Sequence, residues 1–388
     1  MTVRVNPQFL TELKKYGAVN VEKCFNCGNC TAICPLSTSN ESFPRRMIRY
    51  AQLGLKEKLL GNRELWLCYY CGECTQTCPQ QADPGEFMAA ARRYAIASYD
   101  PLGLAKLLYT APIPSILVLV LLAVVIGLGV YSVHGPMPSD TLKFFDFIPS
   151  SVIHTVGVTG MIVVGLLILM GMANMIAKVR SEDAKGIRTN WLNALWEAIV
   201  VEALTQRRFQ RECETASDQK VWYRQKWFVH ASTLWGFLGL LLATALDYGL
   251  EMVGVKATGT WVPLWYPVRL LGTIAGLFLV YGTSMAFLRR IRKTDEATTY
   301  STSSDWAFLS LLWLTGMSGF ILEIAEYLPS PAPWVYWTLL CHISVAGELL
   351  LLLPFTKFAH AIYRTIALYF HALKPAPVVQ AIKAGTDG

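Results

Sequence analysis

Cysteine is the residue type with the clearest chemistry in this 388-residue sequence, because eight of its ten copies fall into one repeated pattern. The pattern is C-x2-C-x2-C-x3-C-P, and it occurs once from Cys24 to Pro35 and again from Cys68 to Pro79. In two-cluster ferredoxins three close cysteines hold one [4Fe–4S] cluster, and the fourth reaches across to the other. The spacing therefore predicts two clusters with crossed ligand sets: Cys24, Cys27, Cys30 and Cys78 for one, and Cys68, Cys71, Cys74 and Cys34 for the other.

Zinc binding and disulfides are the alternatives for these cysteines. Zinc closes with four ligands and typically uses two C-x2-C pairs, not two runs of four. Cluster-bound thiolates imply a reducing compartment, which disfavours disulfides. The remaining Cys213 and Cys341 are predicted to be ordinary residues.

The composition indicates a membrane protein with a soluble N-terminal part. Apolar residues make up 53% of the chain and charged residues 16%, against about 25% charged in an average soluble protein. The apolar excess begins after residue 110. We therefore expect an all-α chain with an α-helical ferredoxin domain over residues 1–105, a transmembrane cytochrome b domain over 110–370 and a flexible tail over 374–388.

Six apolar stretches are near or above the ~20 residues that cross a bilayer. They lie near residues 113–133, 152–177, 228–250, 265–288, 306–326 and 334–360. Basic residues gather in the connections at 178–227 and 289–293, so the positive-inside rule predicts a multi-pass protein of the cytoplasmic membrane with both termini and both clusters in the cytoplasm. The net charge of +7 is explained by these loops and does not indicate nucleic-acid binding.

Two helical features are expected on the cytoplasmic side. Residues 190–209 are too short and charged to span, and they predict an amphipathic helix that lies on the membrane surface or docks the ferredoxin domain. Five arginines of the ferredoxin domain could face lipid head groups or an acidic partner, or could line solvated helix faces. They are Arg45, Arg46, Arg49, Arg92 and Arg93.

Four histidines lie within the apolar stretches at two matched depths. His154 and His342 are near the outer side, and His230 and His360 near the cytoplasmic side. On one continuous helix, eighteen residues make five turns, so His342 and His360 would share a face about 27 Å apart. The pattern predicts two bis-histidine b haems. Hydrogen bonding across helices or a proton path is the alternative, Pro354 could rotate the common face, and His371 is the other candidate for the inner ligand.

Charged residues near the membrane edges suggest further roles. Arg269 is the outer candidate for binding a haem propionate, and Arg224 and Lys226 are the inner candidates; snorkelling anchors are the alternative. Glu348 lies within the last span, where acids usually mark proton or substrate paths. Candidates for exchanging quinol protons, or simply for ending helices at water, are Asp247, Glu323 and Glu326.

These motifs resemble known families. The doubled cysteine run resembles the small iron–sulfur subunit of heterodisulfide reductase. The apolar stretches resemble the cytochrome b subunits of that enzyme and of respiratory nitrate reductase, whose last span also carries two haem histidines at this spacing. The fusion is similar, over nearly the whole chain, to the QmoC family, the membrane subunits of the quinone-interacting membrane-bound oxidoreductase complexes of sulfate reducers. The nitrate reductase subunit has its four ligands on two helices, whereas here they fall on three.

The resemblance implies an electron-transfer subunit of a quinone-dependent oxidoreductase, not a complete enzyme. The implied partners are two cytoplasmic flavin and iron–sulfur subunits (QmoA- and QmoB-like), with menaquinol as donor and adenylylsulfate reductase as acceptor in sulfate respiration. No nucleotide-binding loop occurs in the sequence, so flavin would belong to the partners. Alternatives are a heterodisulfide-reductase-like or other quinone-linked subunit, a haem-free membrane anchor for a ferredoxin domain, and a proton translocator that uses Glu348.

Overall fold

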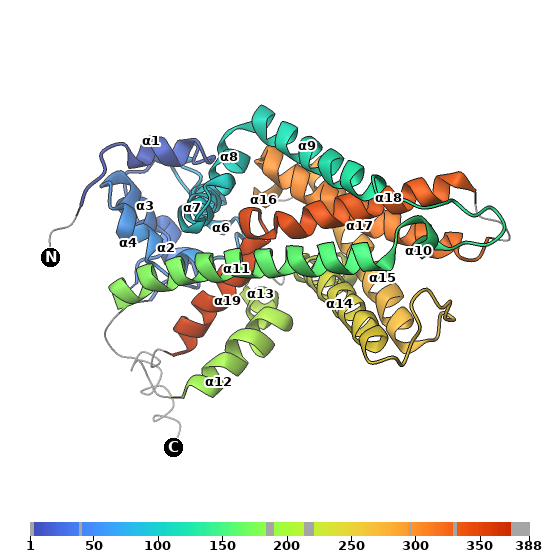
Figure 1. Cartoon of the computed structure of the whole chain (residues 1–388). Coiled ribbons are helices and arrows are strands. Elements are labelled where there is room, and N and C mark those ends of the chain that lie inside the picture. The colour runs from blue at the N-terminus through green and yellow to red at the C-terminus, as the bar shows by residue number, and fades with distance from the viewer. Residues whose placement is uncertain are drawn as a thin grey trace, which may run out of the picture. The chain divides into compact units, whose positions relative to one another are not determined.

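The computed structural model describes residues 4–38, 41–183, 190–212, 221–294, 296–328 and 332–373 (Figure 1). Every regular element in these ranges is a helix, and the only β interaction there is an isolated bridge between Thr38 and Glu41. The predicted all-α fold is thereby confirmed. The predicted flexible tail at 374–388 lies outside the described residues.

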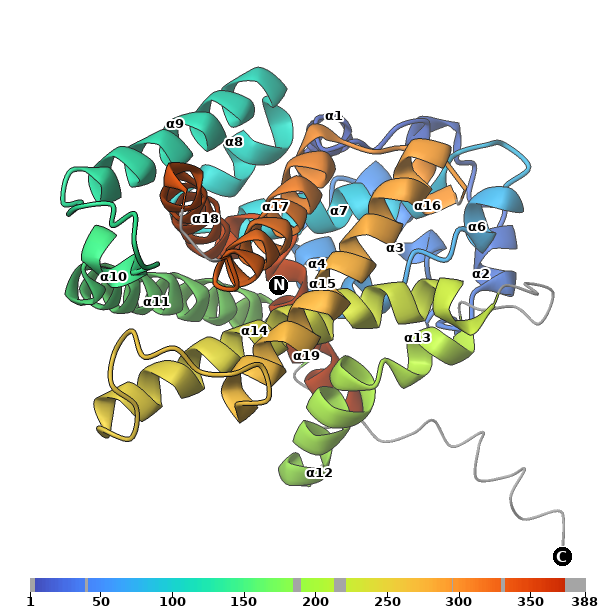
Figure 2. The ribbon, with the colours of Figure 1, turned by 90° about the vertical axis from the view of Figure 1, so that its right-hand side faces the viewer.

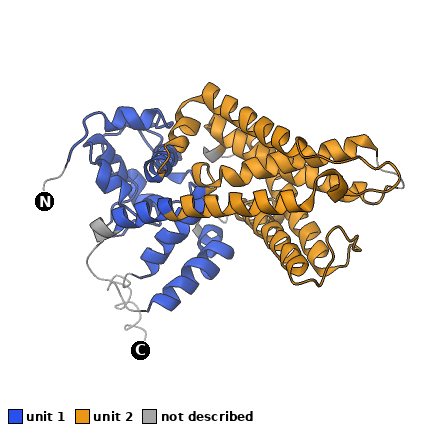
Figure 3. Ribbon diagram, in the orientation of Figure 1, with its two compact units in different colours: residues 1–99, 170–212, 359–388 blue, residues 100–169, 213–358 orange. Residues whose placement is uncertain are grey.

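The chain forms two compact units, and neither is one continuous stretch (Figure 3). The first, here called the cysteine unit, comprises Met1–Tyr99, Met170–Glu212 and Ala359–Gly388. The second, here called the span unit, comprises Asp100–Leu169 and Cys213–Phe358. The sequence-based division at residues 105–110 follows the chain, whereas the cysteine unit also recruits segments from the middle and the end of the chain.

The cysteine unit is built around α7 (Pro84–Tyr99), whose buried side chains include Phe87, Met88 and Tyr99. Short helices from both cysteine runs and the segment between them pack around it. In chain order its other elements are α1 Phe9–Lys14, η1 Val21–Lys23, α2 Asn29–Ile33, α3 Arg45–Gln52, α4 Lys56–Leu60, α5 Glu64–Leu67, α6 Glu73–Gln76, the end of α11 from Met170, α12 Trp191–Trp196, the π-helix η2 Glu197–Leu204, α13 Arg207–Glu212 and α19 Ala359–Ala372.

The helix predicted at 190–209 is observed as α12 followed by η2. Its inner face carries Ala198, which packs in an apolar cluster with Leu67 of α5 and Leu368 of α19. Its other face exposes Trp191 and Trp196, at 57% and 63% of their surface. Of the two predicted roles, docking of the ferredoxin domain is the one that this packing shows.

Six helices of the described chain are long and apolar enough to cross a membrane, and all six lie in the span unit except for the end of α11. They are α9 Pro112–Tyr131, α11 Ser150–Asp183, α14 Lys226–Met252, α15 Pro267–Arg292, α17 Ser303–Ala325 and α18 Pro333–Leu351. This confirms a multi-pass membrane protein. The shorter elements are α8 Leu104–Thr110, α10 Phe144–Phe147, η3 Trp222–Arg224, α16 Glu296–Thr299 and η4 Leu353–Phe355.

Small residues let α14 and α15 approach closely (Figure 2). A Cβ at Gly239 would lie 2.7 Å from the Cβ of Ala275, and a Cβ at Gly236 would meet the backbone of Ala275 and Leu279. Close backbone approach through glycine and alanine is how membrane helices gain packing energy without a hydrophobic driving force.

The last predicted span, 334–360, is wrong as a single helix. α18 ends at Leu351, η4 follows, and α19 begins at Ala359. Pro354 explains the break, because proline lacks an N–H and its ring clashes with the preceding turn. Lys357, just before α19, forms an ion pair with Asp305 of α17, which fixes the chain at the break. His342 and His360 therefore lie on different helices, and the argument that they share a helix face fails.

A glycine that the fold requires gives a first prediction. Gly54 has φ +70°, and a Cβ there would collide with the backbone carbonyl of Asn6, which is held close by an Asn6 N–H to Gly54 carbonyl bond of 2.8 Å. We expect Gly54→Ala to lower the free energy of unfolding by about 3 kcal/mol, measured by denaturation of the purified chain in detergent. Gly103 is the matched control, because its φ is +73° with nothing within 4 Å. Gly103→Ala should cost only about 1 kcal/mol, and equal losses in the two variants would contradict the proposed collision.

Candidate metal centres

The two cysteine runs fold alike around a glycine in the left-handed region. Gly28, with φ 92°, precedes α2, and Gly72, with φ 96°, precedes α6. This conformation favours glycine because it has no Cβ. Each short helix then carries the third cysteine of its run, Cys30 or Cys74, after a tight turn.

The structure brings the cysteines together in two groups. Burial raises the pKa of Cys30, and the nearby thiolates of Cys24, Cys27 and Cys78 raise it further. Burial also raises the pKa of Cys74, with contributions from Cys68, Cys71 and Cys34 and a smaller one from Cys30. In each group the fourth cysteine of one run lies near the first three of the other.

These groups fit iron–sulfur clusters. Thiols with raised pKa values ionise poorly, so a bound metal must supply the positive charge that keeps them as thiolates. Backbone N–H groups already donate to two of the sulfurs, from Tyr70 to Cys68 Sγ at 3.4 Å and from Ala82 to Cys78 Sγ at 3.3 Å. Within the described ranges no three Cys, His, Asp or Glu side chains are placed to hold a single metal ion. A polynuclear cluster spreads its thiolates further apart than the tetrahedral zinc site, with its Zn–S bonds of about 2.3 Å.

The arginines of the ferredoxin domain are mostly internal, which neither predicted role anticipated. Arg46 forms a bidentate pair with Glu64 at 2.6 and 2.8 Å. Arg92 donates to the carbonyl of Cys68 at 2.9 Å. Only Arg49 of the five is exposed.

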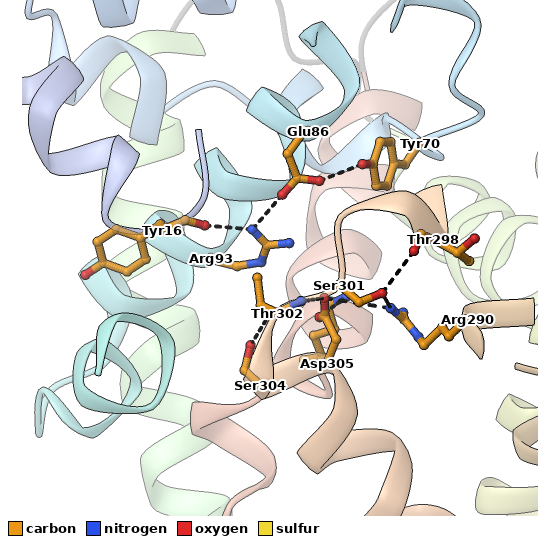
Figure 4. A network of polar contacts seen from close by, with 11 residues as sticks. Tyr16, Tyr70, Glu86, Arg93, Arg290, Thr298, Ser301, Thr302, Ser304 and Asp305 are labelled. Carbon is orange, nitrogen blue, oxygen red and sulfur yellow. Dashed lines mark hydrogen bonds and ion pairs between the residues drawn. The ribbon is translucent and has the colours of Figure 1, made fainter. Parts of the chain in front are cut away.

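Arg93 is the centre of a buried network that ties α7 to both cysteine runs (Figure 4). Its Nη1 donates to Glu86 Oε1 at 2.9 Å and to the carbonyl of Tyr16 at 2.6 Å. Tyr70, within the second run, donates its hydroxyl to Glu86 Oε2 at 2.6 Å. Burial and the Glu86 carboxylate raise the pKa of Tyr70, so its hydroxyl stays a donor at neutral pH.

Sequence reasoning missed Arg364, which α19 places against the second cysteine run. Its Nη1 donates to the carbonyl of Trp66 at 2.7 Å and to that of Cys68 at 3.2 Å. Its guanidinium lies over the ring of Tyr69, 3.9 Å from the centroid. No local signal could have found it, because nearly three hundred residues separate it from the run.

Of the four predicted haem histidines, His342 has the environment that best fits a metal ligand. Its Nδ1 is 2.9 Å from Ser318 Oγ on α17, which leaves Nε2 for iron. His154 on α11 instead directs Nε2 toward Glu251, 3.7 Å away, beside the ring of Tyr248. The chain neighbours Ile153 and Ile343 pack against the same apolar cluster in the span unit. His230 is exposed on α14, and His360 belongs to the cysteine unit.

The charged residues predicted at the outer side form one cluster. Arg269 donates to Glu326 Oε2 at 2.7 Å and lies 3.6 Å from Glu323 Oε1, which also accepts from Thr273 at 2.6 Å. The predicted propionate partner and two predicted proton carriers thus neutralise one another. Asp247 pairs separately with Lys256 at 2.6 Å.

Two further candidates differ in burial. Glu348 on α18 is 2% exposed, and its Oε1 has no hydrogen-bond partner within the described part of the chain. Arg224 is exposed, with its guanidinium 5.8 Å from the ring of Tyr223. Lys226, the first residue of α14, is partly buried.

The N-terminal part matches known iron–sulfur proteins. Residues 20–82 match the family described as a 4Fe-4S dicluster domain. A heterodisulfide reductase-like protein of Archaeoglobus profundus is 38% identical over 101 residues, 24% of this chain and 54% of that protein. The iron–sulfur subunit of the CoB–CoM heterodisulfide reductase of Methanopyrus kandleri is 32% identical over 71 residues, 16% of this chain and 37% of that protein. The chain thus carries two [4Fe–4S] clusters and is an electron-transfer subunit related to the small iron–sulfur subunit of heterodisulfide reductase, although it spans only a third to a half of these relatives.

The rest of the chain matches a different description. "Citrate utilization protein B" of Escherichia coli is 27% identical over 275 residues, 70% of this chain and 68% of that protein. No solved structure matches the chain. Residues 102–378 match the family described as Citrate utilization protein B, and the chain belongs to that family.

Proposed function

We propose that the chain is the membrane subunit of a quinone-linked complex and carries electrons between menaquinol and soluble flavin and iron–sulfur subunits. The observation that supports this most is the joining of two crossed cysteine groups and six spans in one chain, with His342 held through Nδ1 on a span. When bound, the clusters and two b haems supply one-electron transfer without an open coordination position.

The protein residues have distinct parts in this proposal. The two cysteine sets hold the clusters. Ser318 orients the His342 ring so that Nε2 faces outward to a ligand. His154, His230 and His360 are the other proposed haem ligands, and His154 would have to turn away from Glu251 to serve.

Acidic side chains are proposed to handle the protons of the quinol. Glu323 and Glu326 lie at the outer end of α17 with Arg269 between them, where a carboxylate can take a proton and pass it to water. Asp247 is the neighbouring candidate at the end of α14. Glu348 is proposed as a proton path residue within the span, because its buried Oε1 has no hydrogen-bond partner in the described part of the chain and acids inside spans usually serve such paths.

The proposed partners follow from the resemblance to the QmoC family. They are two cytoplasmic subunits, QmoA- and QmoB-like, with adenylylsulfate reductase as the downstream acceptor in sulfate respiration. The basic loops favour a cytoplasmic position for the clusters and both termini. The Escherichia coli relative is named for citrate utilization, so the acceptor is proposed separately from the quinone-linked core.

Spectra of the purified chain test the core of this proposal. We expect a b-type pyridine haemochrome and reduction of haem and clusters by a menaquinol analogue. His342→Ala should lose about half of the haem, because one of two bis-histidine sites loses a ligand. His371→Ala, outside the spans, should keep all of it. A chain with both clusters and no b-type absorbance would instead be a membrane anchor for a ferredoxin domain.

A further inference from the structure

Two arginines from distant parts of the chain donate to one backbone carbonyl, that of Cys68. Arg92 of α7 does so at 2.9 Å and Arg364 of α19 at 3.2 Å. Both belong to the cysteine unit. They converge on the first residue of the run that supplies three ligands to the second cluster.

These two charges have no carboxylate partner among the described residues. The polar contacts of Arg92 and Arg364 are with backbone carbonyls, and Nη2 of Arg364 is buried without any hydrogen-bond partner there. A buried cation without a counter-charge is costly. The anion that offsets this cost is the cluster itself, since four thiolates around [4Fe–4S] leave a net negative charge.

The position of Arg364 is fixed by packing. Tyr69 lies beneath its guanidinium and stacks on Phe209, with centroids 5.1 Å apart and an interplanar angle of 3°. Tyr363, the preceding residue, contacts Trp66 and Tyr99. A side chain held on both sides keeps its charge at a constant distance from the cysteine run.

The first cysteine run has a different setting. A Cβ at Gly28 would lie 3.0 Å from Nη1 of Arg45, so one guanidinium faces that turn. Cys27 is exposed there, and Phe25 is 60% exposed. Solvent exposure and local charge are two of the factors that set the potential of a cluster, so the two sites are built to differ.

We propose that Arg364 and Arg92 are positioning residues that raise the reduction potential of the cluster held by Cys68, Cys71, Cys74 and Cys34. Reduction adds one electron from the donor and makes the cluster more negative, and two adjacent cations stabilise that form. His360, one helical turn before Arg364, shares its face of α19 at a rise of about 6 Å. This cluster is therefore the one beside the helix of the proposed inner haem ligand, and the cluster of Cys24 faces the soluble partner. The inference rests on the proposed electron-transfer function.

A redox titration followed by electron paramagnetic resonance tests the proposal on the full chain in detergent, with dithionite and mediators. Arg364→Gln should make reduction of the second cluster at least tenfold less favourable, a shift of about 59 mV to lower potential. Arg364→Lys keeps the charge and should retain most of the wild-type potential. Arg45→Gln is the matched control, because it should shift the other cluster instead.

Several results would overturn the proposal. One is an unchanged second cluster in Arg364→Gln; another is an equal shift in the Gln and Lys variants, which indicates a role in packing only. If Arg364→Gln fails to retain its clusters, Arg92→Gln decides, since the same downward shift is expected and its absence refutes the idea. Missing haem would contradict the proposed function while leaving these cluster potentials measurable, so the two failures can be told apart.

Discussion

Serine in place of Cys78 should remove the cluster of the first cysteine run and spare that of its own run. Cys78 lies near Cys24 and Cys30, and its thiolate helps to raise their pKa values. A [4Fe–4S] cluster with three thiolates is labile, so we expect iron to fall from about eight to about four atoms per chain. Cys34→Ser should do the reverse, because Cys34 lies near Cys74.

Iron and sulfide analysis together with electron paramagnetic resonance of the reduced protein checks this result. Cys341→Ser is the control, since Cys341 is exposed on α18 and belongs to neither group. It should keep all the iron. If Cys78→Ser removed instead the signal that Cys71→Ser removes, the ligands would be grouped by run and not crossed.

The cysteine pattern and most spans were predictable because their signals are local. Ligand spacing and a run of about twenty apolar residues can be read without knowing what packs nearby. α9 begins at Pro112 against a predicted 113, and α14 ends at Met252 against a predicted 250. These elements depend on the solvent around them more than on particular neighbours.

The last span shows where local reading fails. Hydropathy continues through Leu351 to Phe358, so a single helix to residue 360 was expected. One proline and one ion pair, Lys357 with Asp305, end α18 instead and assign His360 to the cysteine unit. Matching histidines by depth along a helix assumed a continuity that Pro354 removes.

The arginines show a second limit. Arg46, Arg92 and Arg93 have no sequence feature that separates them from the exposed Arg49. Their roles come from partners that only the fold supplies, such as Glu64, the carbonyl of Cys68, and Glu86. Arg364 carries the same lesson further, because its contacts join the end of the chain to a turn near its beginning.

The buried pair of Arg93 and Glu86 should be the strongest determinant of stability in the cysteine unit outside the clusters. Both side chains are almost fully enclosed, at 4% and 2% exposed. Arg93→Leu would leave the Glu86 carboxylate buried beside the hydroxyl of Tyr70 and without its cation, and it would free the carbonyl of Tyr16. Breaking a buried ion pair from one side costs about 3–5 kcal/mol, so the thermal midpoint should fall by roughly 10 °C.

Bleaching of the cluster absorbance on heating, at one fixed scan rate, measures this loss. Arg49→Leu removes an exposed arginine and should change stability by less than about 0.5 kcal/mol. The double variant Arg93→Leu with Glu86→Leu separates charge from packing. If the penalty comes from the stranded carboxylate, replacing both partners by apolar side chains should recover more than half of the midpoint. If the double variant is instead less stable than Arg93→Leu, the pair acts through its hydrogen bonds to Tyr16 and Tyr70, which hold the two cysteine runs on α7.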